Sequence, residues 1–191
     1  CSPVDGVVQD IVRGAKRKII EIIINTIPKQ NKNISKPINF KKYSSEKIKE
    51  ILLGSGCWPF IKQRPYDIIA NPLDIPKSIF ISAFNSAPIS ANLSFVLKDQ
   101  EEEFKLGIEV LSKLTKGQIN VCVEKNNSSF ISEIKNVNLY TISGPHPSAN
   151  VGVQIHHIDP INIGDRVWTI GAEDVAIIGR LFKTGLYNPI R

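Results

Sequence analysis

The sequence predicts an α/β protein, a three-layer sandwich with a mostly parallel sheet, preceded by a β-hairpin. Short β-branched runs alternate with amphipathic helical segments after residue 44, a pattern typical of parallel sheets covered by helices. The chain has 191 residues, 42% hydrophobic and 22% charged, which suits a globular protein with a real core. No apolar run approaches the roughly 18 residues that a membrane span needs.

Residues 1–27 are predicted to form the hairpin, because two β-rich runs flank Arg13-Gly14-Ala15 and the glycine permits a turn. The most apolar run, residues 19–24, is short and β-branched and carries a glutamate, so it predicts a strand. Residues 28–43 are polar, with two prolines and several asparagines, and we expect a linker. The α/β domain then covers residues 44–191.

The first part of this domain begins with a helix. Ser44-Ser45 is expected to cap a helix over 46–53, which Gly54 stops. Residues 54–78 contain four prolines and are expected to be irregular. A buried strand is predicted over 79–84.

A helix of about 16 residues is expected after Asp99, with an acidic first turn, an apolar stripe and an end at Gly117. The remaining expected elements are strands over 119–123, 137–142 and 166–170, and a helix over 173–183 before Gly185.

The net charge of +6 is unevenly distributed, with +8 in residues 1–64 and −2 in residues 65–191. A basic front suggests an anionic partner, such as a lipid surface or an acidic protein, although a solvated lysine face explains it as well. The aromatic residues that a single-strand nucleic-acid binder needs are sparse here, so we expect no nucleic-acid partner.

The sequence contains no standard catalytic, phosphate-binding or metal-binding motif. The three cysteines, Cys1, Cys57 and Cys122, have no metal-like spacing and suggest a reducing compartment. Cys122 lies in an apolar strand and is expected to be a small buried hydrophobic residue. We therefore assign no catalytic, cofactor-binding or metal-binding residue.

The stretch 144–160 holds all three histidines of the chain. Gly144-Pro145-His146-Pro147 predicts a stiff loop, because two prolines fix the backbone and remove two donors. The loop follows the strand 137–142, and ligands of parallel sheets bind beyond the carboxyl ends of strands. It is therefore either a ligand-facing loop or only a rigid connection to a following helix.

Ordered short motifs extend over nearly the whole chain. They are Ser2-Pro3-Val4, Arg13-Gly14-Ala15-Lys16-Arg17, Ser55-Gly56, Trp58, Arg64-Pro65, Gly107, Gly144-Pro145-His146-Pro147, Gly152, Ile155-His156, Asp159-Pro160, Trp168, Asp174-Val175 and Gly179 to Gly185. Together they resemble the A subunits of sodium-translocating NADH:quinone reductases, a bacterial respiratory pump. The chain has no methionine and opens with Cys-Ser-Pro, so we expect a part of a longer protein, truncated at both ends.

The resemblance implies a peripheral subunit on the cytoplasmic face of the bacterial inner membrane. The complex couples NADH oxidation by ubiquinone to sodium export, using NADH, flavins, iron–sulfur centres and ubiquinone. This piece would be a non-catalytic scaffold that docks other subunits, including membrane subunits, with a possible share in quinone access. The alternative is an active flavin/NADH-binding dehydrogenase module. The resemblance further implies the flavin-binding fold of the complex I NADH-dehydrogenase subunit, after a hairpin remnant of a lipoyl/biotinyl-like barrel.

Two departures from related sequences affect the sites. Residues 54–61 stand where flavin-binding relatives have a glycine-rich loop, and the bulk of Trp58, Pro59 and Phe60 argues against a bound flavin. Gln154 stands where the family tends to have a histidine, which argues against a two-histidine metal site.

The aromatic residues Trp58, Phe60 and Tyr66 beside Arg64 could cover a quinone ring or dock another protein of the complex, and core packing is the alternative. The candidate quinone or docking residues are Trp58, Phe60, Arg64, Gly144, Pro145, His146, Pro147 and His156.

Overall fold

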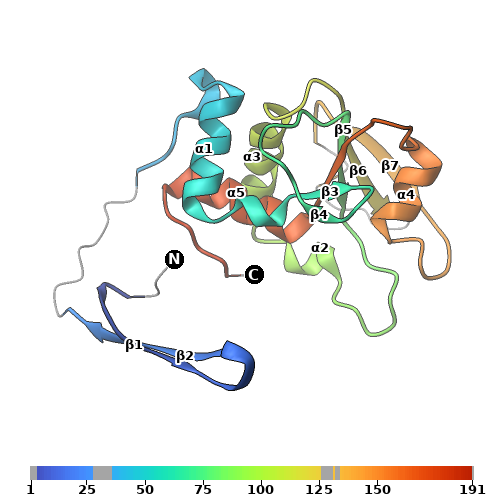
Figure 1. Cartoon of the computed structure of the whole chain (residues 1–191). Coiled ribbons are helices and arrows are strands. Elements are labelled where there is room, and N and C mark those ends of the chain that lie inside the picture. The colour runs from blue at the N-terminus through green and yellow to red at the C-terminus, as the bar shows by residue number, and fades with distance from the viewer. Residues whose placement is uncertain (1–3, 28–35, 126–130, 132–133, 191) are drawn as a thin grey trace. The chain divides into compact units, whose positions relative to one another are not determined.

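The computed structural model describes residues 4–27, 36–125, 131 and 134–190 (Figure 1). Residues 1–3 of the predicted hairpin and 28–35 of the predicted linker lie outside this range. The chain divides into two compact units, residues 1–35 and residues 36–191, and each is described by itself.

The first unit is an antiparallel hairpin of β1 (Gly6–Arg13) and β2 (Ile19–Thr26), joined through the 3-10 turn η1 (Ala15–Arg17). The predicted hairpin is therefore confirmed. Most of its aliphatic side chains are exposed, namely Val7, Val8, Ile11, Ile19, Ile20, Ile22 and Ile23 in the strands and Ile27 directly after β2. Two strands alone bury too little apolar surface for independent stability.

The second unit is built on a six-stranded sheet in the order β4-β3-β8-β5-β6-β7. Its parallel part consists of β5 (Ser78–Ser82), β6 (Ile119–Glu124), β7 (Asn138–Ile142) and β8 (Val167–Gly171). These are the four predicted strands, each shifted by at most two residues at an end. The mostly parallel α/β architecture is thus confirmed.

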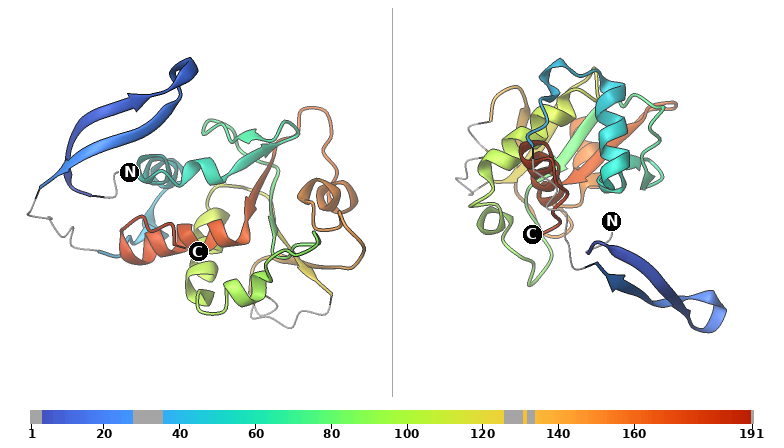
Figure 2. Two further views of the ribbon diagram at one scale, coloured as in Figure 1. Left: turned by 90° about the horizontal axis from the view of Figure 1, so that it is seen from below. Right: turned by 90° about the vertical axis from the view of Figure 1, so that its left-hand side faces the viewer.

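Helices cover both faces of this sheet (Figures 1 and 2). The helices are α1 (Ser45–Ser55), α2 (Leu93–Val96), α3 (Glu101–Ser112), α4 (Val151–Ile158) and α5 (Ala172–Thr184), with 3-10 turns η2 (Phe40–Lys42) and η3 (Trp58–Phe60). The larger core packs α1, α3 and α5 against Ile79 and Ile81 of β5. Phe80, between these two residues, belongs to a smaller core under Ile155 of α4. The alternation along β5 therefore explains why residues 78–81 of the strand are all buried.

The expectation of irregular structure over 54–78 was wrong in two places. β3 (Lys62–Arg64) pairs antiparallel with β8, and β4 (Ile68–Ile69) pairs antiparallel with β3. Strands of three and two residues are too short for an alternation signal, and the surrounding prolines obscured them.

The helix boundaries also required correction. Gly54 does not stop α1, because Gly56 two residues later adopts the left-handed conformation (φ +82°) and its N–H binds the carbonyls of Leu52 and Leu53. Asp99 does not cap α3, whose N-cap is Gln100, a residue whose side chain makes no capping hydrogen bond. Gly117 lies five residues beyond the end of α3, and a Cβ there would lie 1.7 Å from the Lys77 carbonyl oxygen. Gly117 is therefore needed because the Lys77 backbone lies too close for any side chain. The four-residue α2 was not predicted.

Close helix packing places α5 directly against α3. A Cβ at Gly107 would lie 2.1 Å from the Val175 carbonyl oxygen, and a Cβ at Gly179 would lie 1.7 Å from that of Glu103. Both glycines are therefore needed for the two backbones to meet. α5 begins at Ala172, directly after the carboxyl end of β8, and its packing on α3 holds it in this position.

Candidate functional site

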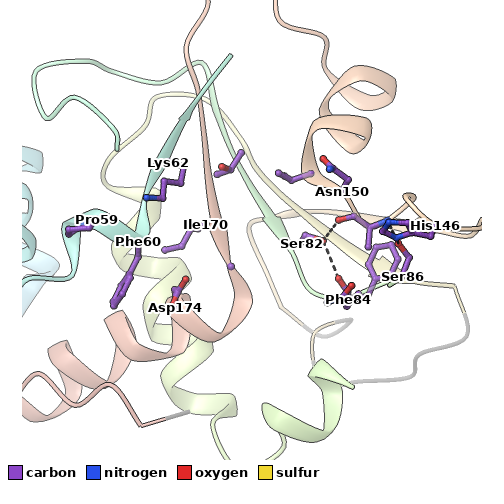
Figure 3. Close-up of a pocket in the computed structure, with 15 residues that line it drawn as sticks. Pro59, Phe60, Lys62, Ser82, Phe84, Ser86, His146, Asn150, Ile170 and Asp174 are labelled. Atoms are coloured by element: carbon purple, nitrogen blue, oxygen red, sulfur yellow. Dashed lines mark hydrogen bonds between the residues drawn. The ribbon is translucent and has the colours of Figure 1, made fainter. Parts of the chain in front are cut away.

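The candidate site lies where the neighbouring parallel strands β5 and β8 end, at Ser82 and Gly171. α5 begins directly after β8, and α4 begins beside the end of β5. A cavity of about 520 Å³ opens there. Its lining side chains labelled in Figure 3 are Pro59, Phe60, Lys62, Ser82, Phe84, Ser86, His146, Asn150, Ile170 and Asp174. Ligands of parallel α/β sheets bind at this edge, so the cavity is the leading candidate.

His146 forms part of one wall together with Ser86 (Figure 3). The Ser86 hydroxyl accepts the Ala149 N–H at 3.0 Å and lies 3.2 Å from Nδ1 of His146. When the Ser86 hydroxyl donates to Nδ1, the proton of the neutral His146 ring is on Nε2. Nε2 is then the ring nitrogen left to donate to a ligand.

The loop before α4 is held by its own short hydrogen bonds. The Ser148 N–H donates to Pro145 O at 2.9 Å, and the Asn150 N–H donates to Pro147 O at 2.8 Å. Asn150 then caps α4, because its side chain accepts the Gly152 N–H at 2.9 Å. The prolines thus build a compact turn that fixes His146 at the cavity.

The side chain of Gln154 connects α4 to the end of β5 by a hydrogen bond. The side chain is buried, and its Nε2 donates to the Ser82 hydroxyl at 3.1 Å. Ser82 in turn donates to Ala149 O at 3.1 Å. The amide nitrogen of Gln154 is therefore occupied by protein acceptors, the Ser82 hydroxyl and the Ser148 carbonyl.

The opposite wall combines an aromatic ring with a lysine. Half-buried Phe60 stacks on Tyr187, with ring centroids 6.5 Å apart. Lys62 of β3 lines the same cavity, and its ammonium forms no ion pair with any of the described residues. Asp174 in the first turn of α5 adds a carboxylate. The site thus offers the Phe60 ring and the Lys62 ammonium on one wall and the His146 imidazole on the other (Figure 3).

Trp58 and Tyr66 do not form a surface with Phe60. Trp58 is buried, donates its indole N–H to Ala70 O at 2.7 Å and packs edge-on against Trp168. Tyr66 is 71% exposed and does not line the cavity. The core-packing alternative therefore holds for Trp58.

The other candidate residues lie in several places. Gly144 and Pro145 line an adjoining cavity of about 260 Å³ that also includes His146. Arg64 binds Asp67 at 3.3 Å, and Pro147 contributes its carbonyl to the turn. Exposed His156 contacts the ring of His157. The structure therefore brings Phe60 and His146 to one cavity, whereas Arg64, Pro147 and His156 are outside its lining.

The buried cysteines are unsuited to nucleophilic chemistry. Desolvation by burial raises the pKa of Cys122 to about 12, and burial also raises the pKa of Cys57. No cluster of three metal-ligating side chains occurs among the residues that the structure describes. Within the same ranges, no helix has the length and apolarity required to cross a bilayer.

Ser82, Ser86, Lys62 and Asn150 were missed as site residues. The polar run after the buried strand 79–84, which includes Asn85 and Ser86, was the available signal, because it follows a parallel strand at its carboxyl end. Lys62 had no such signal, since its short strand was not predicted.

Comparison with known proteins identifies the family. Residues 43–187 match the family described as the NqrA second alpha/beta domain. The A subunit of the Na(+)-translocating NADH-quinone reductase of Histophilus somni is 33% identical over 96% of the chain, and that of Hahella chejuensis is 36% identical over 96%. The corresponding protein of Neisseria gonorrhoeae is 34% identical over the whole chain.

The chain spans 42–43% of the length of these relatives. The family model covers most of the chain, and its match includes both walls of the cavity. The resemblance predicted from the ordered motifs is thereby confirmed, and the chain belongs to the family of the A subunits of Na(+)-translocating NADH-quinone reductases.

Proposed function

We propose that this chain acts within a peripheral subunit of a respiratory sodium pump, which couples NADH oxidation by ubiquinone to sodium export. Its similarity to the family's A subunits over 96–100% of its length carries this proposal. In this role the chain is a scaffold at the cytoplasmic face of the inner membrane that docks other subunits.

The cavity at the ends of β5 and β8 supports a share in quinone access. A quinone is a flat ring whose two carbonyl oxygens accept hydrogen bonds. Phe60 offers the ring a flat apolar surface, while Nε2 of His146 and the ammonium of Lys62 are donors. A volume of about 520 Å³ accommodates the head group.

The backbone of residues 56–61 does not fit a flavin phosphate. The N–H groups of Cys57, Phe60 and Ile61 donate within their own turn, to the carbonyls of Leu52, Cys57 and Trp58. Pro59 has no N–H at all. A phosphate cradle needs several free backbone N–H groups, so we infer that flavin is bound elsewhere in the complex.

We also propose a descent from the flavin-binding fold of the complex I NADH-dehydrogenase subunit, in which the α/β domain of residues 44–191 keeps the architecture without the flavin. The exposed aliphatic residues of β1 and β2 support the companion proposal, that residues 1–27 belong to a small lipoyl/biotinyl-like barrel and residues 28–43 link it to the domain.

The test is an amide chemical-shift titration with a water-soluble short-chain quinone, with FMN as the comparator. We expect saturable shifts around Phe60 and His146 for the quinone only. Phe60→Ala and His146→Ala should weaken them, whereas Tyr66→Ala and His156→Ala, which alter exposed residues outside the cavity lining, should not.

Quinone shifts that persist unchanged in both cavity variants would remove the cavity from the quinone route. Saturable FMN shifts at residues 56–61 would restore the dehydrogenase alternative. An absence of shifts for both ligands would leave the docking role and reject quinone binding by this chain.

A further inference from the structure

A second concave surface lies at the opposite edge of the sheet. Residues 72–75 and 113–116 precede the parallel strands β5 and β6, so they lie at the amino ends of the strands, whereas the candidate site lies at the carboxyl ends. Together with one side of α1 they line a groove of about 510 Å³. The groove is therefore separate from the cavity that holds Phe60 and His146.

The groove exposes large aliphatic side chains. Leu53 of α1 is 49% exposed, Leu73 is 88% exposed and Ile75 is 58% exposed, and all three line it. Single exposed aliphatic residues are common on protein surfaces, but several in one concave surface mark an interaction site.

The lysines around the groove bond to backbone carbonyls rather than to acidic side chains. Lys49 donates to the carbonyl oxygen of Pro72 at 2.6 Å, and Lys113 donates to that of Lys41 at 3.3 Å. Neither these lysines nor Lys116 forms a salt bridge within the described part of the chain. The groove therefore combines an apolar floor with positive charge that no described carboxylate neutralises by direct pairing.

Two glutamates on the α1 side offset part of this charge, so the positive charge of the groove is concentrated at Lys113 and Lys116. Glu50 is paired with Lys47 at 2.8 Å. Glu46 lies in the first turn of α1, where a backbone hydrogen bond lowers its pKa and keeps it ionised. A flat anionic bilayer would approach these carboxylates as well as the lysines, whereas a polypeptide can direct its own acidic residues to the lysine side alone.

We infer that this groove binds an acidic amphipathic segment of another polypeptide. The apolar face of the segment covers Leu53, Leu73 and Ile75, and its carboxylates pair with Lys113 and Lys116. This is the arrangement by which amphipathic helices bind apolar grooves. The inference rests on the proposed function in one respect, because it identifies the partner as another subunit of the pump.

The test measures binding of the whole chain to the pump purified without its A subunit, with vesicles of phosphatidylglycerol and phosphatidylcholine as a separate probe. Leu73→Glu should weaken binding to the pump about tenfold or more, as loss of an interface anchor does. Leu73 is 88% exposed, so this change leaves the fold intact. Ile163→Glu is its matched control, since Ile163 is fully exposed outside the groove.

The charge component has its own variant pair. Lys113→Glu with Lys116→Glu should weaken binding and flatten its salt dependence between about 50 and 300 mM, because screening acts on the lost ion pairs. Lys98→Glu with Lys125→Glu changes the net charge equally at exposed positions outside the groove and should bind normally.

Each result separates this inference from the proposed function. Normal binding by Leu73→Glu and by the Lys113/Lys116 variant would overturn the groove and leave the pump role intact. Failure of the unaltered chain to bind the pump would overturn both. Groove-dependent binding to the anionic vesicles, without groove-dependent binding to the pump, would replace the polypeptide partner with a lipid surface.

Discussion

Replacing Gly179 by alanine tests whether backbone contact between α3 and α5 holds the domain together. The new Cβ would lie 1.7 Å from the Glu103 carbonyl oxygen and 2.9 Å from the Gly107 nitrogen, and both are backbone atoms that cannot rotate away. An ordinary carbon–oxygen contact is about 3.3 Å, so the helices must separate by roughly 1.6 Å.

The cost follows from this displacement. A gap of about 1 Å already forfeits up to about half of the dispersion energy of a contact, and overpacking in cores costs about 1–3 kcal/mol. We take the upper end, about 3 kcal/mol, because every clashing atom is backbone, and subtract about 1 kcal/mol for the better helix propensity of alanine. The expected loss is about 2 kcal/mol, or a fall of about 4–8 °C in Tm for a domain of this size.

The assay is urea unfolding followed by tryptophan fluorescence, because both tryptophans of the chain, Trp58 and Trp168, are buried in this domain. Gly54→Ala is the matched control. Gly54 lies inside α1 with nothing within 4 Å of its added Cβ, so the same substitution should stabilise by about 0.5–1 kcal/mol. A Gly179→Ala midpoint equal to or above that of the unaltered protein would refute the reasoning.

Two substitutions and one labelling experiment test the electrostatics and the core. The pKa of Asp165 lies below its ordinary value, because its carboxylate accepts the Asn162 N–H and forms an ion pair with Lys77. The carboxylate therefore contributes to folding stability above the unfolded-state pKa of about 4, and this contribution is lost as pH falls through the folded-state pKa. Asp165→Asn should therefore lose stability at pH 7 and show a shallower decline of Tm below about pH 4; parallel Tm–pH curves would contradict this. Cys122, with its pKa raised to about 12, should resist iodoacetamide at pH 8 until urea unfolds the domain, and rapid native labelling found by mass spectrometry would contradict its burial. Trp58→Phe leaves a buried carbonyl oxygen without its 2.7 Å hydrogen bond and should cost about 1–3 kcal/mol in urea unfolding followed by circular dichroism, whereas an unchanged midpoint would show that this bond is not needed.

The inner parallel strands could be predicted because burial on both faces favours a mostly apolar run. Residues 119–123 are apolar except for Asn120, and β6 forms there. β3 and β4 gave no comparable signal, because they have only three and two residues and are strands through pairing alone, β3 with β8 and β4 with β3. The end of α1 could not be predicted exactly, because either Gly54 or Gly56 could end the helix. The left-handed backbone conformation of Gly56 decides between them, and it is seen only in the structure.

The candidate site was predicted in part. His146 was found because its two flanking prolines indicate a stiff loop after a parallel strand, and Phe60 was found as one of several aromatic residues. Sequence spacing could not separate Phe60 from Trp58 two residues earlier, because η3 turns one ring to the cavity and the other into the core. Lys62 depended on the β3–β8 pairing, a contact between segments more than 100 residues apart.

The exposed hairpin has a consequence for the colloidal behaviour of the protein. β1 and β2 pair only with each other among the described residues, so each outer edge presents a row of open backbone donors and acceptors. The Ile22-Ile23-Ile24 run on one of these strands has high β propensity and no charge, the composition that seeds intermolecular sheets. These few residues therefore set the concentration at which the protein remains monodisperse, whatever the stability of the α/β domain. Charged substitutions at these positions should raise the concentration that can be used for crystallisation or NMR.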